Sequence, residues 1–190
     1  MLFRSYGARR VHGLNHTVTN SLLFSLIGGG GLSLIMALFP SHILTLAGGS
    51  PGVTSLGSTF LSLTALCLAP NIASSVFSAV LRGTDHAKAP LIATTISVVL
   101  NTVLSYLLVY GWGPVPALGV AGAGWATLLT AVLKSVILAF QVFGTYKVSQ
   151  WEAPASWQAF VTELRPVFVT AIPFGLTELV WTLEIGRAHV

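Results

Sequence analysis

Residues 80–127 read VLRGTDHAKAPLIATTISVVLNTVLSYLLVYGWGPVPALGVAGAGWAT, and the order of features in this stretch decides the fold. A short charged loop is followed by a long uncharged apolar run that contains Asn101, Ser105 and Tyr106. A turn rich in glycine and proline then leads into a second apolar run that begins with small residues. Each run reaches the length of about 20 residues that spans a bilayer, so the stretch predicts two membrane-spanning helices joined by a short turn.

The composition extends this prediction to the whole chain. Of the 190 residues, 54% are hydrophobic and 7% are charged, against about 25% charged residues in soluble domains. No Asp, Glu, Lys or Arg occurs between Arg10 and Arg82 or between Lys88 and Lys134. An unusually apolar soluble protein is the weaker alternative, because so little charge cannot cover a water-exposed surface. We therefore expect the lipid bilayer to be the main partner of the chain.

Five apolar segments are long enough to cross the hydrocarbon layer of about 30 Å as helices. Helices are required because backbone N–H and C=O groups find no water inside the bilayer. The predicted fold class is all-α, a polytopic transmembrane helix bundle with about five transmembrane helices. The segments cover residues 17–46, 53–81, 89–112, 118–143 and 161–185.

The stretches that connect these segments alternate between charged and uncharged. Residues 1–16, 82–88 and 144–160 carry charged side chains, whereas residues 47–52 and 113–117 carry none. Because positively charged loops stay in the cytoplasm, this alternation predicts a multi-pass cell-membrane protein with a cytoplasmic N-terminus. The net charge of +4 reflects these loops, and we expect no nucleic acid among the partners.

Nothing in the sequence indicates an enzyme or a bound cofactor. Cys67 is the only cysteine, and the histidines lack the spacing of metal ligands, so neither a disulfide nor a metal site is expected. Residues 48–52, GGSPG, fit the G-x-S-x-G pattern of hydrolases but lie between two predicted helices instead of at a strand-to-helix turn. An intramembrane enzyme would also need a paired nucleophile and base within the helices, and none is visible.

Glycine and proline interrupt three of the segments. Residues 28–31 are four consecutive glycines, which permit either close packing or a bend in a membrane helix. We favour close packing. Pro70 and Pro173 lie inside predicted helices and are expected to kink them, because each proline removes one backbone hydrogen bond.

Asn101 and Ser105 stand one helical turn apart and therefore share a face. An amide without a hydrogen bond is unfavourable in hydrocarbon, so this face should point into the bundle. The spacing leaves two interpretations open, interhelical hydrogen bonding and a cation or ligand site, and it favours the first. Thr127 ends a row of small residues with Gly119 and Ala123, and its hydroxyl oxygen is a ligand of the kind that hard cations bind.

Two of the charged residues inside the predicted helices, Lys134 and Glu178, are candidates for a function. For Lys134, in the fourth segment, snorkelling toward the cytoplasmic interface or a structural pairing is favoured over a direct role in transport. Glu178 follows Pro173 in the fifth segment. An intramembrane carboxylate is a candidate proton carrier, and a paired but inactive carboxylate is an equal alternative.

With these features the sequence resembles the multidrug and toxic compound extrusion (MATE) family. The resemblance covers nearly the whole chain and rests on an ordered set of motifs rather than on any single one. In chain order the motifs are YGARR at 6–10, LRGTD at 81–85, LN at 100–101, VYG at 109–111, LGVAGAGWAT at 118–127 and IP at 172–173.

The resemblance implies both architecture and function. Members of the family have twelve helices in two lobes and export small cationic or amphipathic organic substrates against a sodium or proton gradient, without a bound cofactor. The five segments then correspond to helices three to seven of such a transporter in the bacterial inner membrane. Residues 1–145 would form part of the N-terminal lobe with four transmembrane helices, 146–160 a cytoplasmic linker, and 161–183 the first helix of the second lobe.

The family's cation site combines an Asp on helix one, an Asn and an acidic or amide residue on helix five, and a Thr on helix six. Asn101 matches the Asn and Thr127 matches the Thr, whereas Ser105 stands where the acidic or amide residue is expected. Some members also carry a Glu on helix seven. Glu178 lies three residues before that position, which makes it a candidate for the cavity or the proton path.

Two expectations concern what the sequence represents. Residues 184–190, EIGRAHV, look like a translated sequencing adapter, and we expect an artefact here rather than a native helix end. The expected function is that of a fragment of a cation-coupled multidrug efflux antiporter that works by alternating access. A lipid-linked oligosaccharide flippase of the same superfamily, for which Lys134 is a weak sign, and an inactive membrane fragment are the alternatives.

Overall fold

The computed structural model describes residues 11–46, 48–112, 116–152, 158, 160–162 and 169, with side chains for all of these except 11–14, 53 and 56. The chain forms two compact units, Met1–Trp151 and Glu152–Val190. Their boundary lies within the stretch 146–160 that we expect to be a linker. Pro173, Glu178 and the expected artefact at 184–190 lie outside the described residues, as does nearly all of the fifth segment.

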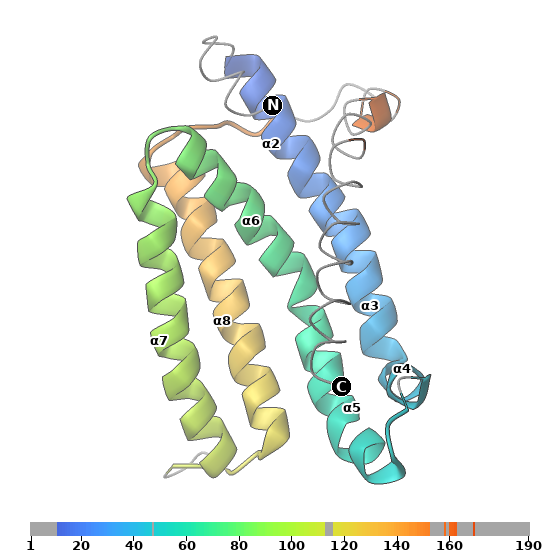
Figure 1. Ribbon diagram of the computed structural model, residues 1–190. Coiled ribbons are helices and arrows are strands. Elements are labelled where there is room, and N and C mark those ends of the chain that lie inside the picture. The colour runs from blue at the N-terminus through green and yellow to red at the C-terminus, as the bar shows by residue number, and fades with distance from the viewer. Residues whose placement is uncertain are drawn as a thin grey trace, which may run out of the picture. The chain divides into compact units, whose positions relative to one another are not determined.

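Four helices in the described part of the chain are long and apolar enough to cross a membrane. They confirm the first four predicted segments and the all-α fold class, and the described residues include no β-strand. Successive spans run in opposite directions (Figure 1). The spans are Asn15–Leu38, Gly57–Gly83, Lys88–Tyr110 and Val120–Thr145.

The first span contains a π-helix that overlaps the run of four glycines. A Cβ atom on Gly29 would lie 2.7 Å from Cδ1 of Ile72, whereas Gly30 and Gly31 have nothing within 4 Å of that position. The predicted close packing is therefore observed at Gly29 and is absent at the next two glycines. The elements of this span are α2 (Val11–Phe24), the π-helix η1 (Ser25–Gly29) and α3 (Gly30–Leu38).

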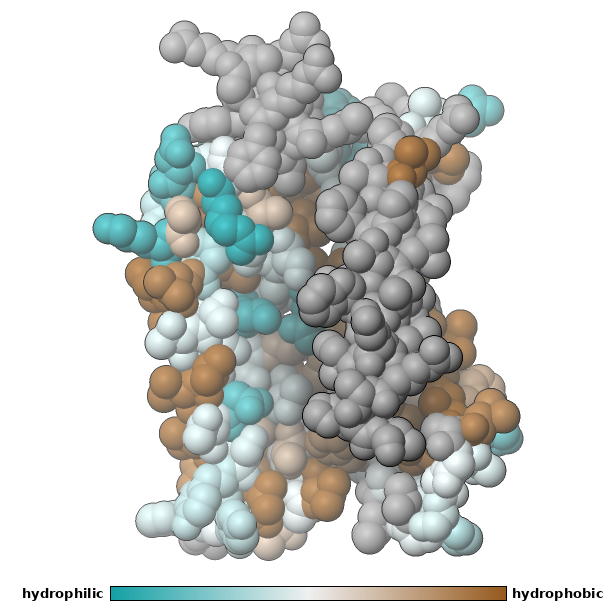
Figure 2. All heavy atoms as spheres, viewed as in Figure 1, coloured by the Kyte–Doolittle hydropathy of each residue, from teal (hydrophilic) through white to brown (hydrophobic). Residues whose placement is uncertain are grey.

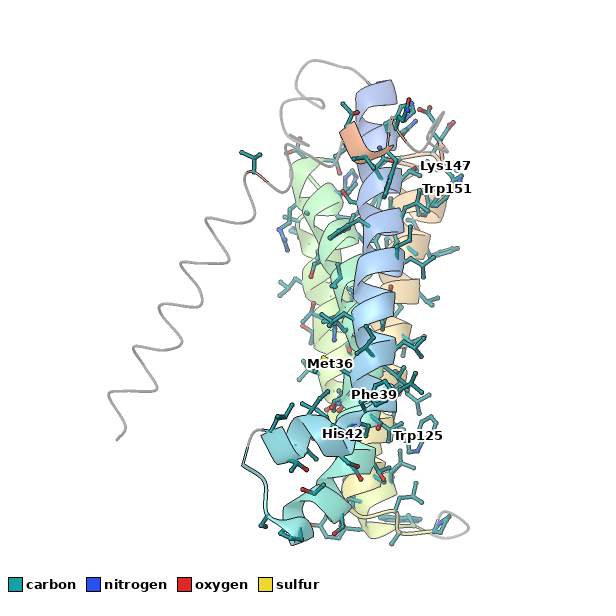
Figure 3. The ribbon with its side chains drawn as sticks, turned by 90° about the vertical axis from the view of Figure 1, so that its right-hand side faces the viewer. Met36, Phe39, His42, Trp125, Lys147 and Trp151 are labelled. Carbon is teal, nitrogen blue, oxygen red and sulfur yellow. The ribbon has the colours of Figure 1, made fainter. Side chains whose placement is uncertain are left out.

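The first span ends earlier than predicted. At Phe39 the backbone angles of φ −120° and ψ 42° leave the helical region. The short helix α4 (Pro40–Leu46) then turns away from α3 (Figure 3). The single segment predicted over 17–46 is therefore wrong at its end. The cause is Pro40, because a proline disfavours the helical conformation in the residue before it.

The second span is interrupted where α5 (Pro51–Leu66) meets α6 (Leu68–Gly83) at Cys67. Pro70 has no N–H to donate to the Leu66 carbonyl, so the regular hydrogen-bond ladder stops one turn before the proline. The predicted kink at Pro70 is confirmed, and it falls on the N-terminal side of the proline.

Serine side chains of the first span bond to backbone carbonyls around this break. The Ser33 hydroxyl donates to the Ala65 carbonyl at 2.7 Å, and the Ser25 hydroxyl donates to the Ala69 carbonyl at 3.3 Å. Both serines are buried. A broken helix is tolerated in a bilayer when neighbouring side chains satisfy its backbone in this way.

The third and fourth spans form a hairpin whose turn depends on two glycines with positive φ, Gly111 at 77° and Gly119 at 56°. A Cβ on Gly122 would overlap the Leu108 carbonyl, so the absence of a side chain permits the two helices to touch. Small residues commonly permit such close contacts between membrane-spanning helices. The elements are α7 (Lys88–Tyr110), α8 (Val120–Phe140) and the π-helix η2 (Gln141–Thr145).

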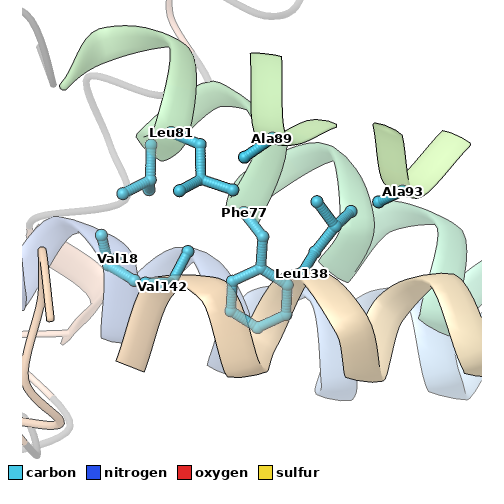
Figure 4. Close-up of a cluster of buried hydrophobic side chains, with 8 residues drawn as sticks. Val18, Phe77, Leu81, Ala89, Ala93, Leu138 and Val142 are labelled. Carbon is cyan, nitrogen blue, oxygen red and sulfur yellow. The ribbon is translucent and has the colours of Figure 1, made fainter. Parts of the chain in front are cut away.

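The main buried cluster lies at the end of the bundle where the charged loops are found (Figure 4). There α2, α6, α7 and α8 converge, and the ring of Phe77 meets that of Phe143 edge to face with centroids 5.9 Å apart. Next to the cluster, Ser149 donates a hydrogen bond to Oδ1 of Asn15 at 3.0 Å, which fastens the chain after α8 to α2. The cluster consists of Val18, Phe77, Val80, Leu81, Ala89, Ala93, Leu138 and Val142.

Much of the surface along the spans is apolar, as Figure 2 shows in brown. Large hydrophobic side chains such as Leu91, Val99 and Val136 are more than half exposed, as expected for a surface that meets lipid. Trp125 and Trp151 lie near opposite ends of the bundle (Figure 3). Tryptophan prefers the two membrane interfaces, so their placement agrees with a bundle that spans the bilayer.

Candidate polar site in the membrane-spanning bundle

An open cavity of about 250 Å³ lies among α6, α7 and α8, and we call it the polar cavity because most of the residues that line it are polar. Lys134, which lines it, is about 21 Å from the Val120 end of its span and about 16 Å from the Thr145 end, at 1.5 Å of rise per residue. Hydrophilic side chains are visible near mid-height of this side of the molecule in Figure 2. The cavity is lined by Asn71, Ser97, Val98, Asn101, Thr102, Thr127, Thr130, Ala131 and Lys134.

One wall of the cavity is held together by hydrogen bonds between α7 and α8. The Asn101 amide donates through Nδ2 to Oγ1 of Thr130 at 3.1 Å. One turn earlier on α7, the Ser97 hydroxyl donates to the Thr130 carbonyl at 3.2 Å. The Asn101 amide thus forms a hydrogen bond between two helices, which is the interpretation that its spacing in the sequence favours.

The hydroxyl groups of the cavity present oxygen lone pairs rather than protons. The Thr127 hydroxyl donates to the Ala123 carbonyl at 2.9 Å, and the Thr130 hydroxyl donates to the Ala126 carbonyl at 2.8 Å. A hydroxyl has a single proton to donate, so each of these groups can serve the cavity as an acceptor. Such a wall suits a cation or a hydrogen-bond donor, because hard cations bind oxygen ligands.

Lys134 supplies the positive charge of this cavity. Its Nζ donates to Oδ1 of Asn71 on α6 at 3.3 Å. Structural pairing, one of the two favoured interpretations of this lysine, is therefore observed. Among the described residues that line the cavity there is no carboxylate to neutralise the ammonium group.

The ammonium group weakens the case for a free cation in the same space. A cavity of about 250 Å³ is about 8 Å across if it is compact, and two unit positive charges at that distance repel by about 2 kcal/mol at an effective dielectric constant of about 20. A sodium ion bound here would have to overcome that repulsion with neutral oxygen ligands.

The predicted site residues fall into three groups. Asn101 and Thr127 both line the cavity. Ser105 lies one turn further along α7, is half-buried, and is not part of the lining. Glu178 lies outside the described residues.

Besides Lys134, four polar residues of the lining were not predicted as site residues, namely Asn71, Ser97, Thr102 and Thr130. The spacing of Ser97 and Asn101, one turn apart, was a usable signal for a polar face that runs from Asn101 toward the N-terminus of α7. No comparable signal marks Asn71, which lies on a different span.

The MatE family model matches residues 4–107, more than half of the chain. Many membrane transporters place their binding sites between helices near the middle of the bilayer, and the cavity lies near the middle of the fourth span. The chain belongs to the MATE family.

Two curated relatives and two solved structures illustrate the similarity. A probable multidrug resistance protein NorM from Thermotoga maritima is 34% identical over 100 residues, covering 52% of this chain and 22% of that protein. A probable multidrug resistance protein NorM from Chromobacterium violaceum is 26% identical over 185 residues, covering 93% of this chain and 38% of that protein. The chain thus spans less than two fifths of the length of these relatives.

The fold agrees with solved MATE structures. An inward-facing conformation of a multidrug resistance MATE family transporter superposes with a TM-score of 0.73 at 25% identity, over 86% of this chain and 37% of that one. A MATE crystal structure in a bent conformation gives a TM-score of 0.74 at 24% identity over the same shares of the two chains, which supports the fold.

Proposed function

We propose that the protein containing this chain is a cation-coupled multidrug efflux antiporter that works by alternating access. Membership of the MATE family supports transport. The names of the relatives, probable multidrug resistance proteins, support drugs as substrates, and we propose small cationic or amphipathic organic molecules as their class. Because the chain spans less than two fifths of these relatives, the proposal concerns the transporter as a whole.

The observation that carries the proposal is the polar cavity at the middle of the spans. We propose Asn101 and Thr127, which line it, as oxygen ligands of the coupling cation, sodium or proton. Ser105 is a further candidate one turn along α7, and Glu178 is a candidate for the cavity or the proton path. Cation and substrate that favour opposite conformations would let one gradient drive the other.

Efflux in living cells tests the proposed function. The complete gene that encodes this sequence is expressed in a drug-sensitive bacterial strain, and accumulation of the lipophilic cation ethidium is followed by fluorescence. Expression is expected to lower ethidium accumulation, and collapse of the driving ion gradient is expected to restore it. Accumulation equal to that of cells with the empty vector, with the protein present in the membrane, contradicts the proposal.

The orientation of the bundle gives a separate prediction. We place the end with Arg82 and Lys88 in the cytoplasm, because positive charge stays on that side. In a Cys67→Ala background, cysteine at the exposed position Ser50 is expected to react with a membrane-impermeant maleimide in intact spheroplasts. Cysteine at the exposed position Ala87 is expected to react only after the membrane is permeabilised. The reverse pattern contradicts a cytoplasmic N-terminus.

A further inference from the structure

We infer that Lys134 is the resident cation of the polar cavity, and that its ammonium group takes the place of a free sodium ion among the oxygens of Asn101 and Thr127. The part of this inference that concerns ion coupling rests on the proposed function. The part that concerns ion binding is a property of the cavity alone.

The first step of the argument is the position of Lys134 on α8. Thr127, Thr130 and Lys134 are spaced three or four residues apart, and all three line the same cavity. Lys134 therefore shares the cavity-lining face of α8 with the two threonines. Its ammonium group bonds to Asn71, which belongs to the same lining.

The second step is the match between donors and acceptors. An ammonium group has three N–H donors, and one of them is used by Oδ1 of Asn71 at 3.3 Å. The hydroxyl groups of Thr127 and Thr130 donate their protons to backbone carbonyls. The Asn101 amide donates a proton to the hydroxyl oxygen of Thr130. The oxygen atoms of these groups therefore remain available as acceptors. They complement the N–H donors of Lys134 that are not bonded to Asn71.

The third step is competition for the same space. The cavity measures about 250 Å³, and its described lining contains no carboxylate that would balance a second positive charge. A sodium ion and the ammonium group would therefore repel each other across neutral ligands. Removing the ammonium charge leaves the oxygen ligands in place and opens the cavity to sodium.

Sodium binding to the complete purified product of the gene tests this inference. Binding of radioactive ²²Na⁺ is measured in detergent solution for the wild type, for Lys134→Met, and for Lys88→Met as a matched control at an exposed position outside the cavity. Lys134→Met is expected to bind sodium at least about tenfold more tightly than the wild type and the control. Equal sodium affinity in the wild type and Lys134→Met overturns the inference.

Two further variants separate a cation role from a structural one. Lys134→Arg keeps the positive charge and is expected to bind sodium as weakly as the wild type. In Lys134→Met, the added change Asn101→Ala is expected to remove the gained sodium binding. If Lys134→Met does not give a monodisperse protein, Lys134→Gln is measured instead with the same expectation, and sodium affinity unchanged from wild type in that variant also overturns the inference.

The binding assay also distinguishes the two proposals from each other. Sodium binding is measured without transport. A wild-type protein that exports no ethidium therefore contradicts the proposed function, and the role of Lys134 is still decided by the sodium measurement. If efflux does occur, the wild type is expected to work equally well in sodium and choline media. Efflux that requires sodium in the wild type overturns the inference while it supports the proposed function.

Discussion

Asn101→Leu is expected to lower ethidium efflux about tenfold or more at equal amounts of protein, the range typical of a lost coupling between two sites. The substitution removes the amide oxygen from the cavity and also the hydrogen bond to Thr130. Leucine branches at Cγ as asparagine does and has a more favourable helix propensity, so the main loss is that of the polar group. Initial efflux rates from preloaded cells provide the measurement, normalised to protein in the membrane.

Two control variants separate the ligand role of Asn101 from interhelical bonding. Thr130→Val removes the partner of the Asn101 amide and leaves the amide itself in the cavity. It is expected to cost much less efflux than Asn101→Leu. Thr95→Val removes an exposed hydroxyl from the same helix outside the cavity and is expected to have no effect. Equal losses in Asn101→Leu and Thr130→Val would show that the Asn101 amide acts only together with the Thr130 hydroxyl and has no separate role as a ligand.

Gly122→Ala is expected to destabilise the protein by about 1–3 kcal/mol, the usual cost of overpacking. The added methyl group would overlap the Leu108 carbonyl, which belongs to the backbone of α7 and has no rotamer with which to move aside. The hairpin of α7 and α8 must therefore separate locally. The midpoint of thermal unfolding in detergent, followed by size-exclusion chromatography, is expected to fall.

Gly31→Ala provides the matched control for this prediction. Gly31 is also a helical glycine, but a Cβ at that position meets nothing within 4 Å. Alanine has a helix propensity about 1 kcal/mol more favourable than glycine, so the unfolding midpoint is expected to rise or stay unchanged. A fall of the midpoint in both variants would mean that glycine is needed for helix flexibility and not for contact with α7.

The sequence was sufficient to predict the four described spans, because length and absence of charge determine membrane insertion. It was not sufficient to place the ends and breaks of the helices. The first span stops at Phe39 because of the local effect of Pro40, which a hydropathy pattern does not register. The break before Pro70 falls at Cys67 because the missing hydrogen bond belongs to the preceding turn.

Some residues of the candidate cavity could be predicted from the sequence, but the contacts between its helices could not. Asn101 and Thr127 line the cavity, and the resemblance to the family identified both. The pairing of Lys134 with Asn71 depends on how α6 and α8 are rotated about their axes. In a membrane both the lipid-facing and the packed faces are apolar, so the periodicity of the sequence does not fix that rotation. Ser105 shares a helix with Asn101, yet the cavity opens toward Ser97 instead.

The π-helix in the first span aligns residues that a regular α-helix would spread apart. Ser25, Gly29 and Ser33 recur every fourth position, and all three are buried. In an α-helix of 3.6 residues per turn, a repeat of four drifts around the axis by about 40° at each step. The wider turn at Ser25–Gly29 reduces this drift, and the row faces the second span, where Ser33 bonds to Ala65 of α5 and Ser25 bonds to Ala69 of α6. The irregular turn thus keeps residues four positions apart closer to the same side of the helix than a regular α-helix would.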